Sequence, residues 1–343
     1  MTCIIILYLL NMKDGSGCYE RKSSMYIGID LGGTNIAVGI VDEHGNIKHE
    51  KSCATRVGRE ANIIIDDMIT LVLNTLEEFN LQLNEIKAIG IGIPGLADKN
   101  GNVLFCVNLG WKNVHLKERL ENALHKPIFI DNDATVAALA EYERGSMKNC
   151  RGGVMLTLGT GIGGGIILNG EVYSGFNGIG SELGHIVVGE NFYNCNCGRN
   201  GCLETFASST AIIKHTKKLI KEMNESTLII KMAGGNVNNI DAKIIFDCAK
   251  LGDKIANLAV NRLVKYLGIG ILNIINFIDP EIIALGGGVA GAGQYLLDMI
   301  VAEVITNKYY EELPIGKIVL AELGNKAGII GAAMIAKHEL LNN

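Results

Sequence analysis

Residues 26–41 read YIGIDLGGTNIAVGIV, and residues 153–168 read GVMLTLGTGIGGGIIL. Each stretch consists of an apolar run, a glycine-rich turn that contains threonine, and a second apolar run. Apolar runs on either side of a glycine turn are typical of a β-hairpin. Two such openings in one chain indicate a duplicated α/β architecture in which each half begins with a hairpin.

Predicted helices and further strands follow each hairpin. A length of 343 residues fits about two domains at roughly 100–200 residues each. Apolar periodicity predicts helices over 61–79, 134–144, 205–222, 242–278 and 327–341, and strands over 88–93, 128–130 and 281–285. The pattern begins abruptly at Met25, so we expect residues 1–24 to be an extension outside the folded core.

The composition disfavours several classes of protein. Thirty-one basic against 36 acidic residues give a net charge of −5, which disfavours a nucleic-acid partner. The longest uncharged run, 152–170, is interrupted by glycines and makes a poor membrane helix, so we expect no membrane association. Six of the nine cysteines are scattered singly, a pattern that fits a reducing cytoplasm better than a disulfide framework.

Glycine is the compositional outlier, with 43 residues, about 12.5% of the chain against an average near 7%. Three glycine loops, 31–34, 159–165 and 285–288, each follow a predicted strand, where backbone N–H groups can converge on phosphate. Two of them match the dinucleotide pattern G-x-G-x-x-G. A dinucleotide-binding loop should be followed by a helix, but a predicted strand follows the first match. Only 52 residues follow the last glycine of the second match, Gly291, which is too few to complete a dinucleotide-binding half. A nicotinamide enzyme is therefore disfavoured.

The most specific signal is a metal-ligand pattern. His185, Cys195, Cys197 and Cys202 fall in the order H-x₉-C-x-C-G-x₂-G-C-x-E. One imidazole and three thiolates form a closed tetrahedral set, which is usual for structural rather than catalytic zinc. The sequence therefore predicts one structural zinc site in the segment 185–202.

Carboxylates at strand ends are candidates for acid–base chemistry. The residues Asp131-Asn132-Asp133 end a predicted strand, and chemistry alone does not choose between the two aspartates as a general base. An aspartate here also has a structural interpretation, as the N-cap of the following helix. Asp30 ends the first strand, where it is placed to bind magnesium through water or simply to form the turn.

These motifs together carry a family resemblance. Residues 29–35 (IDLGGTN), 158–163 (LGTGIG) and 285–288 (LGGG) look like the two phosphate motifs and the adenosine motif of the actin-like ATPase superfamily. With the zinc segment added, the chain from Met25 to about Lys337 resembles the ROK sugar kinases, and among them the bacterial glucokinases. The resemblance implies two actin-like (ribonuclease H-like) α/β lobes with a cleft between them. It places residues 25–133 and the helix at about 327–341 in one lobe, and residues 134–326 in the other.

The resemblance also implies roles for individual residues. It points to Asp133 as the catalytic base. The implied sugar ligands are Gly95, Asn108, Asn132, Asp133, Glu182, His185 and Glu204. The implied nucleotide and magnesium positions are Asp30, Gly32, Gly33, Thr34, Asn35, Gly159, Thr160, Gly161, Gly286, Gly287 and Gly288. One departure is Val107, which stands before Asn108 where the family often has proline.

The implied activity is transfer of the γ-phosphate of MgATP to the primary hydroxyl of a hexose. Glucose is the first expectation, and N-acetylmannosamine, N-acetylglucosamine and fructose remain alternatives that the motifs do not separate. The family also implies a homodimer. It includes sugar-responsive transcriptional repressors with an N-terminal helix-turn-helix domain, and because only 24 residues precede Met25 here, a repressor is not expected.

Overall fold

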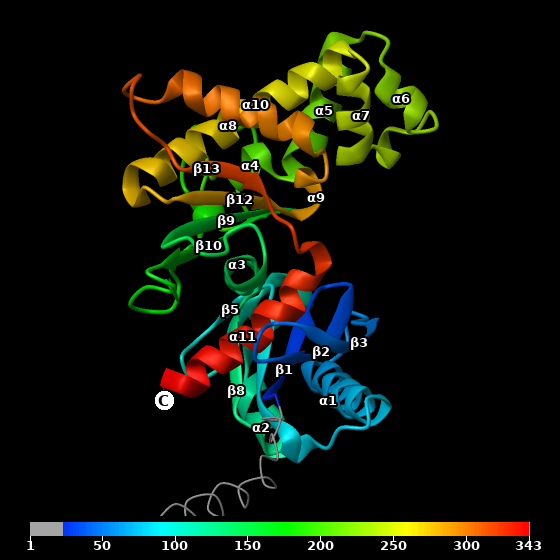
Figure 1. The fold of residues 1–343 in the computed structure, drawn as a ribbon. Helices are drawn as coiled ribbons and strands as arrows, with labels where there is room; N and C mark the ends of the chain where they lie inside the picture. Colours follow the sequence, from blue (N-terminus) through cyan, green and yellow to red (C-terminus); the bar gives the residue numbers. More distant parts are fainter. Residues whose placement is uncertain (1–22, 343) are drawn as a thin grey trace, which may run out of the picture.

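The computed structural model describes residues 23–342, which form two α/β lobes stacked one above the other (Figure 1). The expected extension over residues 1–24 falls almost entirely outside the described residues. The lower lobe contains a five-stranded mixed sheet in the order β3-β2-β1-β4-β8. Its strands are β1 (Met25–Leu31), β2 (Asn35–Asp42), β3 (Ile47–Ala54), β4 (Ile86–Ile93) and β8 (Ile128–Asn132).

The upper lobe repeats this topology. Its five-stranded sheet has the order β11-β10-β9-β12-β13, with β9 (Gly152–Leu158), β10 (Ile162–Leu168), β11 (Glu171–Val172), β12 (Ile282–Gly286) and β13 (Lys317–Leu320). In both sheets the hairpin strands pair antiparallel, and the first strand then pairs parallel with a later strand. The duplicated architecture predicted from the two hairpin sequences is confirmed.

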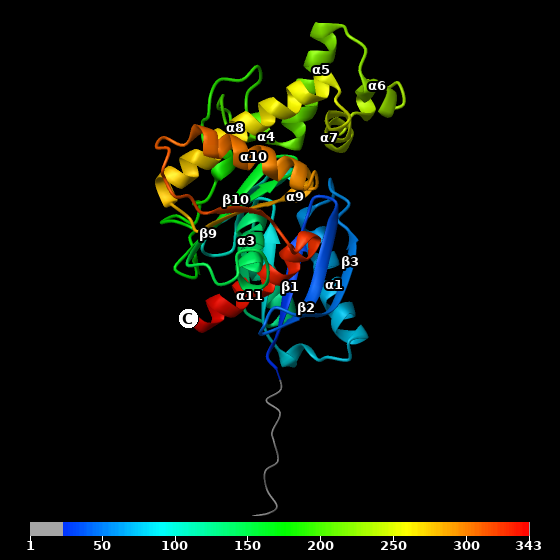
Figure 2. The ribbon, with the colours of Figure 1, turned by 45° about the horizontal axis from the view of Figure 1, so that its top comes forward.

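The helices form outer and inner layers. On the lower sheet the outer layer is α1 (Ala61–Glu78) with α2 (Leu116–Leu124), and their apolar faces join one core. The upper sheet is covered by a larger helical layer that includes α8 (Lys254–Ile278) and α10 (Gln294–Asn307). Figures 1 and 2 show α3 (Asp133–Arg144) and α11 (Ala327–Asn342) between the two sheets, where they share a third core.

Helix α11 sits unusually close to the lower sheet. A Cβ atom on Gly28 of β1 would lie 1.9 Å from the carbonyl oxygen of Ile329, and one on Gly90 of β4 would lie 1.7 Å from that of Ala332. Only glycine permits this separation, because any side chain would displace the helix. At these two positions the backbone of α11 therefore lies directly against the sheet, in addition to the side-chain contacts of the third core.

Two predicted helices prove to be interrupted, and some elements were not predicted. The segment 205–222 divides into α4 (Glu204–Ala207) and α5 (Ser209–Met223), because Ser208 leaves the helix and caps α5. The segment 242–278 divides into α7 (Ala242–Lys250) and α8, because Gly252 has φ +86° and Asp253 caps α8. Elements that were not predicted include α2, α10, α6 (Leu228–Met232) and the small sheet of β5 (Leu96–Ala97), β6 (Val103–Cys106) and β7 (Trp111–Val114).

Helix α8 qualifies the expectation that no segment is long and apolar enough for a membrane span. Among the described residues it passes that test by length and composition. Twelve of its residues are nevertheless buried, and they lie in the core of the upper lobe against other helices. Such a helix is typical of a globular core, so its composition is weak evidence for a membrane.

The close packing of α11 against the lower sheet leads to a prediction about stability. Gly90→Ala should lower the free energy of unfolding by about 3 kcal/mol, because the new methyl group meets the backbone of α11 and the helix must shift. Gly152→Ala is the matched control, since its Cβ would approach only the carbonyl of Ile167, at 3.8 Å. Denaturant unfolding of both variants measures the difference. Equal stabilities would show that the helix can move without cost.

Candidate functional site

A cleft of about 800 Å³ opens between the lobes, at the carboxyl ends of the parallel strands of both sheets. Open α/β sheets commonly bind ligands at this edge. Residues from the lower and the upper lobe line it together. Of the predicted site residues, those that line the cleft are Gly95, Asn108, Asn132, Asp133, Gly159, Thr160, Gly161, Glu182, His185, Cys197, Glu204 and Gly287.

Asp133 lies on the floor of the cleft, where β8 ends and α3 begins. Asp133 is exposed to the cleft, but the surrounding protein partly desolvates its carboxylate, and this desolvation together with the negative charges of Asp30 and Glu182 raises its pKa to about 6. Beside it, Asn132 is the N-cap of α3: its Oδ1 accepts a hydrogen bond from the Ala134 N–H at 2.9 Å, and its Nδ2 donates to the Gly95 carbonyl at 3.1 Å. The helix start therefore fixes Asn132 and presents Asp133 to the cleft.

Asp131, the other aspartate at this strand end, lies in a different place. Its Oδ1 accepts the Asn132 N–H at 2.7 Å, and the residue lines a separate hollow of about 330 Å³ with Glu339. Burial raises its pKa to about 6 as well. The two pKa values therefore do not separate the candidates, but their positions do, because of the two only Asp133 lines the cleft.

The second and third glycine loops lie side by side in the upper lobe. Gly286 pairs with Thr157 of β9, and Gly287 has φ +82°, which favours glycine. Gly287 lines the cleft, whereas Gly286 and Gly288 do not. A Cβ atom on Gly288 would meet nothing within 4 Å, so its backbone remains open to a ligand.

The first glycine loop is the tight turn between β1 and β2. The Gly32 N–H donates to the Asn35 carbonyl at 2.9 Å. Thr55 stabilises the turn further, because its hydroxyl donates to the Gly32 carbonyl at 2.7 Å and its N–H donates to the Thr34 carbonyl at 2.8 Å. None of the predicted residues Asp30, Gly32, Gly33, Thr34 and Asn35 lines the cleft itself. They are adjacent to it: a Cβ atom on Gly33 would lie 3.5 Å from Asn108, and the Asp30 charge acts on Asp133.

Asn108 reaches the cleft from a short 3-10 turn of the lower lobe. The turn covers Val107–Leu109 and ends at Gly110 in the left-handed region. Valine at position 107 is thus compatible with an ordered loop in which Asn108 lines the cleft. Gly95 lies beneath the same loop, since a Cβ atom there would be 2.5 Å from the Phe105 carbonyl.

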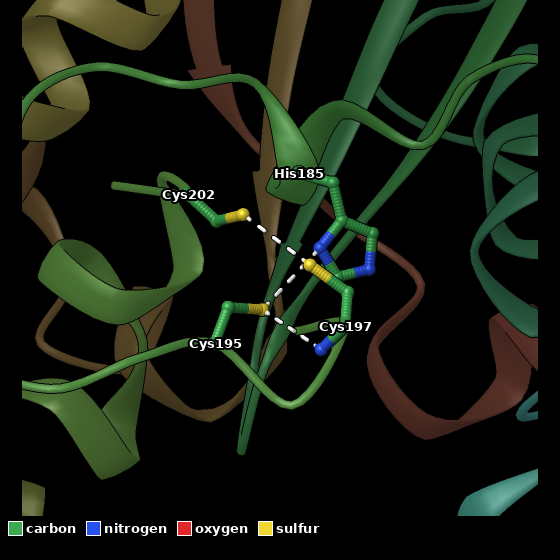
Figure 3. A group of neighbouring side chains, drawn as sticks. All are labelled: His185, Cys195, Cys197 and Cys202. Atoms are coloured by element: carbon green, nitrogen blue, oxygen red, sulfur yellow. Dashed lines mark hydrogen bonds between the residues drawn. The ribbon is translucent and has the colours of Figure 1, made fainter. Parts of the chain in front are cut away.

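The predicted zinc ligands converge on one point (Figure 3). The ligand atoms of His185, Cys195, Cys197 and Cys202 all lie within 4.8 Å of one another. Cys195 Sγ is 3.6 Å from His185 Nδ1, and Cys197 Sγ is 3.6 Å from Cys202 Sγ. Tetrahedral zinc with Zn–S near 2.3 Å and Zn–N near 2.0 Å requires separations of about 3.6–3.8 Å. The set therefore fits a structural zinc ion.

Two carboxylates flank this cluster on the cleft side. His185 Nδ1 faces the thiols, and its Nε2 is 3.9 Å from Glu182 Oε2. Glu204 Oε1 lies 4.0 Å from His185 Nδ1 and accepts the Cys195 thiol at 2.9 Å. His185 and Cys197 of the metal set thus line the cleft together with the two glutamates, whereas Cys195 and Cys202 do not.

Several lining residues were not predicted. Thr135 and Thr157 add hydroxyls, Phe105 and Val107 add an apolar rim, and Arg199 adds a cation. Arg199 donates to the His185 carbonyl at 3.2 Å. Arg199 could have been predicted as a cleft residue, because it lies inside the zinc segment. Thr135 and Thr157 could not, because nothing in the sequence distinguishes them from core residues.

Comparison with known proteins identifies the family. A match to the ROK family covers residues 26–339. The chain belongs to the ROK family. It is 38% identical to a glucokinase of Thermotoga maritima, over 92% of this chain and 98% of that protein. It is 28% identical to a xylose repressor of Caldicellulosiruptor bescii, over 92% of this chain and 79% of that protein.

A solved ROK structure has the same fold. The ROK glucokinase of Streptomyces griseus, in complex with glucose and AMPPNP, superposes with a TM-score of 0.79 at 33% identity, over 92% of this chain and 99% of that one. The expected fold of two related α/β lobes and the expected ROK membership are both confirmed.

The ligand set yields a metal prediction. We expect one zinc ion per chain and its loss in Cys197→Ser, because a serine hydroxyl is a poor zinc ligand. The melting temperature should fall with the metal. Cys53→Ser is the matched control, since that thiol lies outside the cluster. Metal analysis by mass spectrometry and thermal unfolding check both effects, and full zinc content in Cys197→Ser would refute the assigned ligands.

Proposed function

We propose that the protein is an ATP-dependent sugar kinase that phosphorylates the primary hydroxyl of a hexose, with glucose as the first substrate. One arrangement carries the proposal: Asp133, with a pKa raised to about 6, lies in a cleft that also contains a glycine-rich loop and the wall of Glu182, His185 and Glu204. Similarity to glucokinases from two bacteria supports the substrate.

The sugar is proposed to lie on the polar wall of the cleft. Carboxylates of Glu182 and Glu204 accept hydrogen bonds from hydroxyl groups, and His185 offers Nε2, because its Nδ1 faces the thiols. Asn108 and Asn132 supply amide groups from the lower lobe. These contacts would orient the primary hydroxyl toward Asp133, which accepts its proton as the oxygen attacks phosphorus.

The phosphates are proposed to lie along the glycine loops. Backbone N–H groups near Gly33, Thr160 and Gly287 can approach phosphate oxygens closely, and Asp30 would hold magnesium through water. Magnesium supplies positive charge to the transferring phosphoryl group. Zinc at His185, Cys195, Cys197 and Cys202 would orient the neighbouring glutamates, because four protein ligands leave no position for substrate.

Further expectations belong to the same proposal. Lobe closure would exclude water, which competes with the sugar as phosphoryl acceptor. We also propose a cytoplasmic homodimer without nucleic-acid or membrane partners. N-acetylmannosamine, N-acetylglucosamine and fructose kinases are the alternatives within the class.

Coupled ADP release across hexoses and N-acetylhexosamines tests the activity and ranks the substrates. We expect the highest kcat/KM with glucose. Preference for another sugar would correct the substrate but keep the reaction. If the protein binds sugar but releases no ADP with any compound, the proposed kinase activity is overturned. That result would favour a sugar-responsive regulator, since the chain is also similar to a xylose repressor.

The position and pKa of Asp133 predict a pH profile. A base must be ionised to accept a proton, so kcat/KM should rise about tenfold per pH unit below about pH 6 and level off above it. Asp133→Asn should lower turnover by roughly 10²–10⁴-fold and abolish this ionisation. Asp131→Asn is the matched control and should keep turnover and profile. The opposite result would assign the base to Asp131.

A further inference from the structure

Arg262 of helix α8 carries a half-buried guanidinium group that contacts the zinc segment at Asn191. Its Cζ lies 4.7 Å from the ring centre of Phe206 and 5.3 Å from that of Tyr266, and these two rings are stacked at 3.9 Å. Among the ion pairs of residues 23–342, none includes Arg262. A half-buried cation without a carboxylate is costly to desolvate, so its interactions with other groups must offset that cost.

The guanidinium has one directed hydrogen bond, and it leads toward the cleft. Arg262 Nη2 donates to Asn191 Oδ1 at 2.8 Å. Asn191 Nδ2 in turn donates to the carbonyl oxygen of Thr205, which also accepts the Tyr193 hydroxyl at 2.9 Å. Thr205 directly follows Glu204, so this relay ends one residue from a carboxylate of the cleft wall.

No relay residue is itself a metal ligand, because zinc would be held by residues 185, 195, 197 and 202. The relay is nevertheless joined to the part of the zinc segment that carries the cysteines, since the Asn191 N–H donates to Asn200 Oδ1 at 2.9 Å. Thr205 is almost fully buried, and its hydroxyl donates to the Cys202 carbonyl at 2.7 Å. The first turn of α4 is therefore fixed twice, by the zinc cluster through Cys202 and by α8 through Asn191.

We propose that Arg262 and Asn191 are positioning residues that, in addition to the zinc cluster, hold Glu204 in its sugar-binding orientation. The inference rests on the proposed function, in which Glu204 accepts hydrogen bonds from sugar hydroxyls. Arginine suits this role better than lysine, because its planar group can stack on Phe206 and donate to Asn191 at the same time.

Two variants break the relay at different links. Arg262→Met keeps an unbranched apolar stem on Phe206 but removes the donor to Asn191. Asn191→Asp keeps the acceptor for Arg262 but replaces the donor to Thr205 with a carboxylate oxygen. Lys265→Met is the matched control, because Lys265 is an exposed cation on the same helix and lies near Tyr266.

The measurements are sugar affinity by titration calorimetry, the KM values for sugar and ATP, zinc per chain and melting temperature. We expect both relay variants to bind sugar roughly 10–100-fold more weakly, the size of effect that follows when a buried polar group loses its hydrogen-bond partner. Zinc content and the KM for ATP should stay at the wild-type values. Lys265→Met should match wild type throughout.

Three outcomes in the variants would overturn this inference while leaving the proposed function in place. Wild-type sugar affinity in Asn191→Asp would show that the bond to Thr205 does not position Glu204. Zinc loss in parallel with sugar affinity would show that the relay acts through the metal. Equal weakening of sugar and ATP would indicate a general loss of structure. A wild-type protein that binds no sugar would overturn the proposed function and this inference with it, so the two failures are distinguishable.

Discussion

The close contact between backbones in the inner helical layer is the constraint on which the cleft depends. Helix α11 rests on β1 and β4 through Gly28 and Gly90, and α3 rests on β10 in the same way, since a Cβ atom on Gly165 would lie 2.4 Å from Ala138 Cβ. The two helices meet at Gly331, where a Cβ atom would lie 1.8 Å from the Val136 carbonyl. Part of the glycine excess is thus required for packing within the inner helical layer. This close packing brings the strand ends of both lobes to one cleft.

A buried carboxylate strengthens this inner layer. Glu141 of α3 is fully buried and accepts four hydrogen bonds: from the N–H and hydroxyl of Ser146, and from the N–H groups of Glu322 and Leu323 at 2.9 and 2.8 Å. Charge-assisted bonds to several donors compensate a buried anion where no cation is present. Because Glu322 and Leu323 lie between β13 and α11, Glu141 ties that connection to the last turn of α3.

Local patterns were predictable from the sequence, and contacts between distant segments were not. The hairpins around Gly32 and Gly159 and the metal ligands near Cys195 are visible because turn chemistry and ligand spacing act over a few residues. The break at Ser208 escaped prediction because apolar periodicity continues across it. The Arg262 relay has no sequence signature at all, since its partners lie 71 residues apart or are backbone carbonyls.

The charges around the cleft determine how a nucleotide could bind there. Asp133, Glu182 and Glu204 line it and Asp30 lies nearby, while the basic groups of the lining are only Arg199 and His185. An acidic wall suits the hydroxyls of a sugar, but it repels the phosphates of ATP at short range. Under the proposed function, phosphate binding in this cleft would therefore depend on backbone N–H groups of the glycine loops and on a divalent cation. Desolvation is the main cause of the raised pKa of Asp133, and the charges of Asp30 and Glu182 act in the same direction, so the acidic surroundings of the cleft also help to bring the proposed base toward neutral pH.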